Sequence, residues 1–384
     1  MDKTTKTVLK ATALIAGAAG VTALATYGVT CALVQAAMDR QKPRVLQNAD
    51  KIFAGALVSE EVRRFMEQLV QDAQTLAARE DVQRVEMTAQ DGVTLIGHFR
   101  PAKEPKRLLI AMHGWRSSWS RDFGMIADFW YNSGCSVLYV EQRGQNESGG
   151  DCMGFGLTER FDARDWANYA VEHLTDGTLP IYLCGVSMGA TTVLMATGLD
   201  LPEQVHGVMA DCAFTSPDAI WRHVANKNLH LIYDLHRGFA DALCREKLRV
   251  GLTDYSTIDA LKTAVVPVVF VHGTDDHFVP VRMTYENYKA CASPKRLLIV
   301  PGADHGMSYY IDREQYERQS LAFWDEFDDV TPPRGAFSAA ESAAESAPEQ
   351  PADEPQPSAA AEPEQAAAAE PEQTAAAEPP EEQA

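Results

Sequence analysis

The sequence predicts an α/β fold, with a mostly parallel central sheet, helices on both faces and a small helical cap. Between about residues 81 and 330, short apolar runs alternate with stretches of helical periodicity, which is the pattern of parallel strands joined by helices. The chain has 384 residues and 46% of them are hydrophobic, which is enough for a large core. The runs of strand length cover 82–89, 93–100, 107–112, 136–140, 181–184, 205–210, 266–271 and 296–300.

The first two strands flank Asp91-Gly92, a dipeptide typical of hairpin turns, so they are expected to pair with each other. Amphipathic stretches at 157–174 and 283–291 indicate two of the helices between the later strands. In open sheets of this kind, ligands bind beyond the carboxyl ends of the strands. The residues that directly follow each strand are therefore the candidates for chemistry.

The segment Gly185-Val186-Ser187-Met188-Gly189 follows the strand at 181–184 and precedes a helical run at 190–197. In such a strand-to-helix turn a serine is held in a strained conformation, and the flanking glycines leave room for neighbouring backbone. The start of the next helix directs amide N–H groups toward developing negative charge. The pattern is common by chance, but in this context it predicts Ser187 as a nucleophile.

A serine nucleophile needs a base and an acid that orients the base. Asp276 is the predicted acid, because it lies in the loop after the strand at 266–271 and just ahead of Val279-Pro280. Asp275 and Asp211 remain alternatives for this role.

His305 is the predicted base, because it follows the last strand and comes after the acid in the chain, as this arrangement requires. His272 and His277 belong to the acid loop and are interpreted as structural or exposed. In the predicted mechanism His305 removes the proton of Ser187, and the carboxylate stabilises the resulting imidazolium.

The negative charge that develops on the substrate oxygen needs hydrogen-bond donors. The amide of Met188 is one predicted donor, because it directly follows the nucleophile. The amide of Trp115, in the loop after the strand at 107–112, is the second; a packing role for Trp115 is the alternative. This mechanism requires neither a metal ion nor an organic cofactor.

Taken in order, these motifs resemble the α/β-hydrolases. They comprise His113-Gly114, the Arg143-Gly144 loop that ends in Ser148-Gly149-Gly150, the segment around Ser187, Asp276 with Val279-Pro280, and His305. The likeness is greatest to bacterial membrane-anchored or exported members related to serine aminopeptidases and prolyl oligopeptidase-type hydrolases. It covers about residues 85–328 and implies the α/β-hydrolase fold and hydrolytic activity. Glu141 and Asn146 depart from the family pattern, which has Asp and Gly there.

A charge-free run from residue 11 to 38 follows three N-terminal lysines and exceeds the ~20 residues that span a bilayer. We therefore expect residues 1–45 to form a single-pass membrane anchor, with the catalytic domain outside the cytoplasm. Cleavage near Ala23-Leu24-Ala25, which would release a secreted protein, and a cytoplasm-facing orientation are the alternatives. Residues 46–80 are expected to form a helical spacer, capped by Ser59, that packs on the core.

The hydrolase domain is expected to span 81–330, with its cap at about 214–262. Residues 331–384 are expected to be a disordered acidic tail rich in Pro, Glu, Ala and Gln. The net charge is −20, and no Lys or Arg follows residue 335, so the sequence lacks the basic footprint of a nucleic-acid-binding protein. The seven cysteines show no metal-binding spacing and are interpreted as buried apolar residues.

These observations predict a serine hydrolase that cleaves a carboxylic ester or thioester through an acyl-serine intermediate. One alternative is an amidase or peptidase of the serine aminopeptidase type, because nothing in the cap separates ester from amide substrates. Another is a non-catalytic, membrane-tethered scaffold on the same fold. The expected partners are a small-molecule ester or peptide-like substrate and, through the N-terminal helix, a membrane; the oligomeric state stays open.

Overall fold

The computed structural model describes residues 22–41 and 60–332, and its core is one eight-stranded sheet. The strands lie in the order β1-β2-β4-β3-β5-β6-β7-β8. All eight predicted strands are present, with ends shifted by no more than two residues. Their bounds are β1 (Gln83–Thr88), β2 (Thr94–Arg100), β3 (Arg107–Met112), β4 (Cys135–Val140), β5 (Ile181–Val186), β6 (Val205–Asp211), β7 (Val268–Gly273) and β8 (Lys295–Val300).

The sheet is mostly parallel, as predicted. Strands β1 and β2 form an antiparallel hairpin, and β2 pairs antiparallel with β4; every other neighbouring pair is parallel. Side-chain burial explains the short apolar runs, because β3, β4, β6 and β7 are buried along their whole length. The register sets Met112 beside Gly185 and Val186 beside Asp211, so the ends of β3, β5 and β6 meet at one edge.

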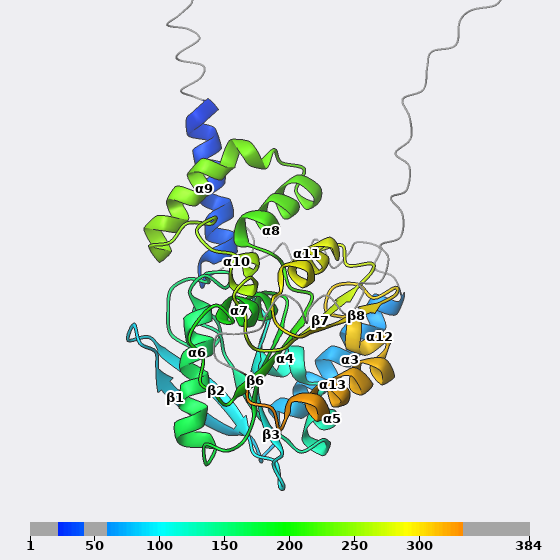
Figure 1. Cartoon of the computed structure of the whole chain (residues 1–384). Helices are drawn as coiled ribbons and strands as arrows, with labels where there is room; N and C mark the ends of the chain where they lie inside the picture. The colour runs from blue at the N-terminus through cyan, green and yellow to red at the C-terminus, as the bar shows by residue number, and fades with distance from the viewer. Residues whose placement is uncertain (1–21, 42–59, 333–384) are drawn as a thin grey trace, which may run out of the picture. The chain divides into compact units, whose positions relative to one another are not determined.

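Helices cover both faces of this sheet (Figure 1). On one face, α6, α7 and α10 pack on the sheet through residues such as Trp166, Val193 and Leu261. On the other, α3, α4, α5, α12 and α13 cover a second core that contains Phe123 and Trp324. The helices of the two layers are α3 (Glu60–Ala77), α4 (Trp119–Phe123), α5 (Ala127–Asn132), α6 (Glu159–Tyr169), α7 (Met188–Ala196), α10 (Thr257–Leu261), α11 (Arg282–Ala290), α12 (Ser308–Ile311) and α13 (Arg313–Phe327).

The predicted cap is helical. It contains α8 (Pro217–His223), a π-helical turn η2 (Val224–Asn228) and α9 (Tyr233–Leu248), which lie at the carboxyl end of the strands in Figure 1. A third apolar cluster joins the cap to the body, with Phe214 and Ile220 packed near Met188 and Phe155. The α/β-hydrolase fold with a small cap is therefore confirmed.

The predicted membrane anchor is wrong. Among the described residues no helix has both the length and the apolar character needed to cross a bilayer. Residues 22–38 do form a helix, and two of its apolar side chains pack in the cap cluster: Val34 and Met38 are 2% and 1% exposed, whereas Leu24 and Val29 are 72% and 45% exposed. A run of Ala, Val, Leu and Thr can be buried in a protein core as readily as in the hydrocarbon layer of a membrane. The membrane localisation and orientation predicted from this run are therefore wrong, and residues 1–21 lie outside the described residues.

The predicted spacer helix corresponds to α3. Its first turn carries Glu60 and Glu61, where negative charge is favourable, and it packs on the second core through Phe65 and Leu76. Ser59, the predicted N-cap of this helix, lies outside the described residues, as does the predicted tail from residue 333 onward.

Candidate active site

The chain turns sharply at Ser187, between β5 and α7. Ser187 has φ 55° and ψ −115°, a strained conformation for a residue with a side chain. The flanking glycines make the turn possible: a Cβ on Gly189 would lie 1.8 Å from the carbonyl oxygen of Met112, and one on Gly185 would lie 2.3 Å from the Gly189 carbonyl carbon. The Ser187 amide donates to the Asp211 carbonyl at 2.8 Å, which ties the turn to β6.

Ser187, His305 and Asp276 form one hydrogen-bonded chain. The Nε2 atom of His305 lies 3.0 Å from Ser187 Oγ, and its Nδ1 lies 2.7 Å from Asp276 Oδ2. The three residues come from the loops after β5, β7 and β8, as the sequence predicts. Ser187 and Asp276 are almost completely buried, and the His305 side chain is 26% exposed. The structure thus brings together the predicted nucleophile, base and acid.

Asp276 is held as a carboxylate by its surroundings. Burial raises its pKa, but hydrogen bonds with His272 and His305 outweigh burial, so the pKa lies well below the usual range. The amides of Phe278 and Val279 also donate to Oδ1, at 2.9 and 2.7 Å. A carboxylate with these four partners stays ionised at neutral pH and accepts a hydrogen bond from His305 Nδ1.

His272 is a site residue whose part in the acid loop the sequence did not specify. Its side chain is fully buried, with Nε2 3.1 Å from Asp276 Oδ2 and Nδ1 2.6 Å from Thr284 Oγ1. It therefore contacts the same carboxylate oxygen of Asp276 as His305 does. One sequence signal could have indicated this role: His272 lies at the end of an apolar strand, four residues before Asp276. His277, by contrast, is exposed.

The basicity of His305 follows from its partner. Burial lowers the pKa of His305, but the hydrogen bond and charge of Asp276 raise it, with smaller contributions from Asp211 and Asp304, and the net effect is upward. A raised pKa makes the ring a stronger proton acceptor, because the imidazolium that forms beside Asp276 is stabilised.

The two alternative acids lie elsewhere in the network. Asp275 is exposed and accepts a hydrogen bond from Thr274. Asp211 is buried beside the site, where Ser308 donates to it at 3.0 Å, and burial raises its pKa to about 6. Neither carboxylate has a hydrogen bond to His305 in the described part of the chain.

The predicted oxyanion donors flank Ser187. Met188 is the first residue of α7, and its amide lacks a hydrogen-bond partner among the residues that the structure describes. Gly114 lies against the nucleophile, since a Cβ built on it would be 3.4 Å from the Cβ of Ser187. The Trp115 amide follows it and is likewise without a partner within the described ranges. Both amides are available to a substrate oxygen.

The helix at 22–38 holds the Trp115 loop from outside. The indole Nε1 of Trp115 donates to the Ala37 carbonyl at 2.7 Å. The Arg116 guanidinium donates to the carbonyls of Ala36 and Asp39 at 2.9 and 2.6 Å. These oxygens lie at the end of the helix, where backbone acceptors lack helical partners, so the loop and the helix end satisfy each other. The sequence did not predict this contact.

Glu141 and Asn146, which depart from the family pattern, both have structural reasons. Glu141 is buried between His98 and His113, at 3.4 and 3.5 Å, and hydrogen bonds with these rings outweigh burial and lower its pKa to about 2. Asn146 has φ 47°, a left-handed conformation that asparagine tolerates. Both residues support the loop behind Trp115.

Cys212, Asp276 and His305 offer three possible metal-ligand atoms within 4.8 Å of one another. The donor set does not suit a metal ion. Burial raises the pKa of the Cys212 thiol well above its usual value, whereas a thiol binds metal as the thiolate. Asp276 and His305 already use these atoms in the chain to Ser187.

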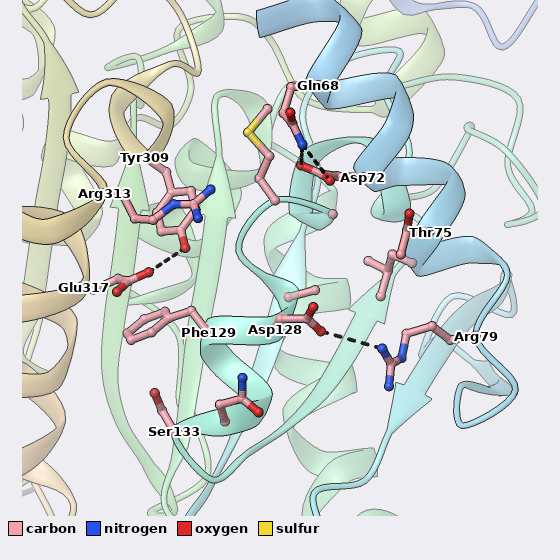
Figure 2. A pocket seen from close by; sticks show the side chains of 15 residues that line it. Gln68, Asp72, Thr75, Arg79, Asp128, Phe129, Ser133, Tyr309, Arg313 and Glu317 are labelled. Carbon is pink, nitrogen blue, oxygen red and sulfur yellow. Dashed lines mark hydrogen bonds and ion pairs between the residues drawn. The ribbon is translucent and has the colours of Figure 1, made fainter.

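Two cavities border α3, and only one includes a residue of the hydrogen-bonded chain. The larger, of about 510 Å³, lies between α3, α5 and α13 and is polar, with Arg79, Asp128 and Glu317 among its lining residues (Figure 2). Several of its polar groups are already engaged with one another: Arg79 contacts Asp128, Tyr309 donates to Glu317, and Gln68 donates to Asp72. The smaller, of about 280 Å³, includes His305 in its wall. Of the two, the smaller cavity is therefore the one that borders the hydrogen-bonded chain.

Comparisons with known proteins agree with this fold. The chain is 27% identical over 234 residues to the uncharacterized protein YqkD of Bacillus subtilis, covering 61% of this chain and 76% of YqkD. It is 25% identical over 248 residues to the uncharacterized protein YfhR of Escherichia coli K12, covering 62% of this chain and 79% of YfhR.

Among solved structures, the esterase Pf2001 of Pyrococcus furiosus superposes with a TM-score of 0.55 at 19% identity, covering 66% of this chain and 94% of the esterase. The acylaminoacyl peptidase of Pyrococcus horikoshii superposes with a TM-score of 0.50 at 14% identity, covering 71% of this chain and 45% of the peptidase. At these identities the likeness concerns the fold. The model of the alpha/beta hydrolase family matches residues 108–319, more than half of the chain. The protein is therefore a hydrolase that belongs to the alpha/beta hydrolase family.

Proposed function

We propose that the protein is a serine hydrolase that cleaves carboxylic esters or thioesters through an acyl-serine intermediate. The observation that carries this proposal is the continuous hydrogen-bonded chain from Ser187 through His305 to Asp276. A strained serine at the start of a helix, with a histidine 3.0 Å from its hydroxyl, is an activated nucleophile. A structural serine needs neither the strain nor the buried carboxylate behind the histidine.

In the first half-reaction Ser187 Oγ attacks the carbonyl carbon of the substrate, and His305 Nε2 takes the hydroxyl proton. The carbonyl π electrons move to its oxygen, which the amides of Met188 and Trp115 stabilise by hydrogen bonds. The tetrahedral intermediate then expels the alcohol or thiol, which receives the proton from His305. Ser187 is left as an acyl ester.

In the second half-reaction a water molecule attacks the acyl ester, and His305 takes a proton from that water. The new tetrahedral intermediate releases the carboxylic acid, and His305 returns the proton to Ser187 Oγ. Asp276 keeps the ring oriented and stabilises its protonated form in both halves. Each oxyanion donor typically contributes about 3 kcal/mol of transition-state stabilisation.

Labelling with a fluorophosphonate probe tests the proposal, because an activated serine displaces fluoride from the probe and becomes phosphonylated. We expect the wild-type protein to be labelled and Ser187→Ala to remain unlabelled. Ser120→Ala is the matched control, since Ser120 is a half-buried serine without a histidine partner in the described residues. A wild-type protein that fails to label, or a Ser187→Ala variant that still labels, would sink the proposal. A p-nitrophenyl ester series then reports the acyl preference.

A further inference from the structure

The smaller cavity beside His305 is apolar and is closed on one side by α3. Phe65 and Met307 form its floor and are 8% and 3% exposed, and Met66 lies at its rim, 39% exposed. The Phe278 ring packs 5.1 Å from the His305 ring. The apolar members of the wall are Val62, Phe65, Met66, Phe278 and Met307.

The polar members of the wall are at the mouth or already engaged. His277 is 83% exposed, and Asn228 of η2 is exposed as well. Asp304 accepts the amides of His277 and His305, at 3.1 and 2.7 Å. In the described residues the wall contains no lysine or arginine. An anionic group would therefore find no counter-charge inside, whereas an apolar group would exchange water for carbon contacts.

The place of His305 in the wall identifies which part of a substrate the cavity faces. The leaving oxygen or sulfur takes its proton from His305 Nε2, so it must come within hydrogen-bond distance of that atom. The group attached to it then lies alongside the imidazole. The acyl group, by contrast, must keep its carbonyl oxygen near the amides of Trp115 and Met188.

We propose that this cavity binds the alcohol or thiol portion of the substrate, and that α3 selects an apolar portion of aryl or short alkyl size. A volume of about 280 Å³ lies at the small end of ligand pockets, which suits one ring or a short chain. The proposal rests on the proposed hydrolase function and adds the substrate class. It also gives α3 a second role besides packing on the core, as a determinant of specificity.

The test varies the alcohol while the acyl group is constant. Values of kcat/KM are measured with methyl, butyl and benzyl acetate, and then with the methyl esters of acetic, butanoic and hexanoic acids. We expect wild type to prefer benzyl or butyl acetate over methyl acetate. Met66→Ser, which removes an apolar wall, should reduce this preference about fivefold and leave the ranking of the acyl series unchanged.

Val70→Ser is the matched control. Val70 is one helical turn further along α3 and is 43% exposed, but it does not line the cavity. The same loss of an apolar side chain there should leave both series unchanged. Equal effects of the two variants, or an effect of Met66→Ser on the acyl series instead of the alcohol series, would overturn the proposal.

These measurements distinguish failure of the proposed hydrolase function from failure of the proposed subsite. A wild-type protein that hydrolyses no ester and takes no fluorophosphonate refutes the proposed function, and the subsite with it. A wild-type protein that hydrolyses these esters without discrimination between the alcohols refutes the alcohol subsite, while the proposed function stands.

Discussion

Two helices that precede the sheet in the chain support the surroundings of Ser187, one at the Trp115 loop and the other at the cavity beside His305. The two helices make different kinds of contact. On the Trp115 side, the helix at 22–38 presents backbone carbonyls to Trp115 and Arg116. On the His305 side, α3 presents apolar side chains to a cavity. Hydrogen bonds to carbonyl oxygens are directional and hold a loop in place, whereas apolar contacts are non-directional and shape a space. One helix is thus suited to position the oxyanion donors and the other to select a ligand.

The substitution with the largest expected effect on stability and labelling lies between these two regions, in the turn around Ser187. In Gly189→Ala the new Cβ would lie 1.8 Å from the Met112 carbonyl oxygen, so β3 or α7 must move. We expect a cost above the ~1–3 kcal/mol typical of overpacking, with loss of probe labelling. Thermal unfolding and labelling report the two effects.

Gly238→Ala is the control, because a Cβ at that helical position has no heavy atom within 4 Å in the described structure. It should raise stability by up to about 1 kcal/mol. A Gly189→Ala variant as stable and as reactive as Gly238→Ala would refute the close approach of β3 and α7.

The next effect concerns the His305 side alone. Asp276→Asn should lower kcat about ten-thousandfold, because an amide cannot stabilise the imidazolium. His305 works as a neutral base, so wild-type kcat/KM should fall at low pH through a pKa above the usual value near 6.5. Without the carboxylate that raises it, the acidic limb of the residual activity should move to lower pH.

Asp275→Asn is the control for this variant, since Asp275 is exposed and its carboxylate accepts a hydrogen bond from its neighbour Thr274 rather than from His305. Its pH profile should match that of the wild type. An equal loss of kcat in both variants would mean that the orienting acid has been assigned to the wrong carboxylate.

A smaller effect is expected on the Trp115 side. Arg116→Ala removes the hydrogen bonds to the Ala36 and Asp39 carbonyls. We expect the free energy of unfolding to fall by about 2 kcal/mol and kcat to fall about tenfold with little change in KM, because the oxyanion contact forms in the transition state. The measurements are urea unfolding and ester kinetics.

Arg318→Ala, which breaks an exposed pair with Glu314 on α13, serves as the control and should change neither quantity measurably. If Arg116→Ala raised KM alone, the helix at 22–38 would act on substrate binding, and the contrast between the two sides would fail.

The smallest effect separates the backbone of Trp115 from its side chain. Trp115→Phe keeps the amide and the packing on Phe155 but loses the hydrogen bond to Ala37. Stability should fall by about 1 kcal/mol and kcat by less than about threefold. A loss of kcat as large as that of Arg116→Ala would show that the indole, and not the loop position, supports the reaction.

The sheet and the residues after its strands were predictable, because period, length and turn residues are local signals. Ser187 stands in a local motif, and Asp276 and His305 follow from strand order. The approach of Phe65 and Met66 to His305 joins residues some 240 positions apart, and no local pattern encodes it. The helix at 22–38 was misread because Val34 and Met38 would suit a bilayer as well as the cap cluster. Hydropathy indicates that a segment favours apolar surroundings, but it does not indicate whether a bilayer or a protein core provides them.

The alpha/beta hydrolase family model begins its match at residue 108, and both the helix at 22–38 and α3 precede that point. The shared region supplies the reacting groups, while these two additions supply the support of one side and the wall of the other. On the proposed assignment, the reacting groups lie within the matched region, whereas the cavity wall combines α3 with residues of the matched region such as Phe278 and Met307. If α3 selects the alcohol portion as proposed, a substitution in α3 changes the preferred ester while Ser187, His305 and Asp276 stay the same.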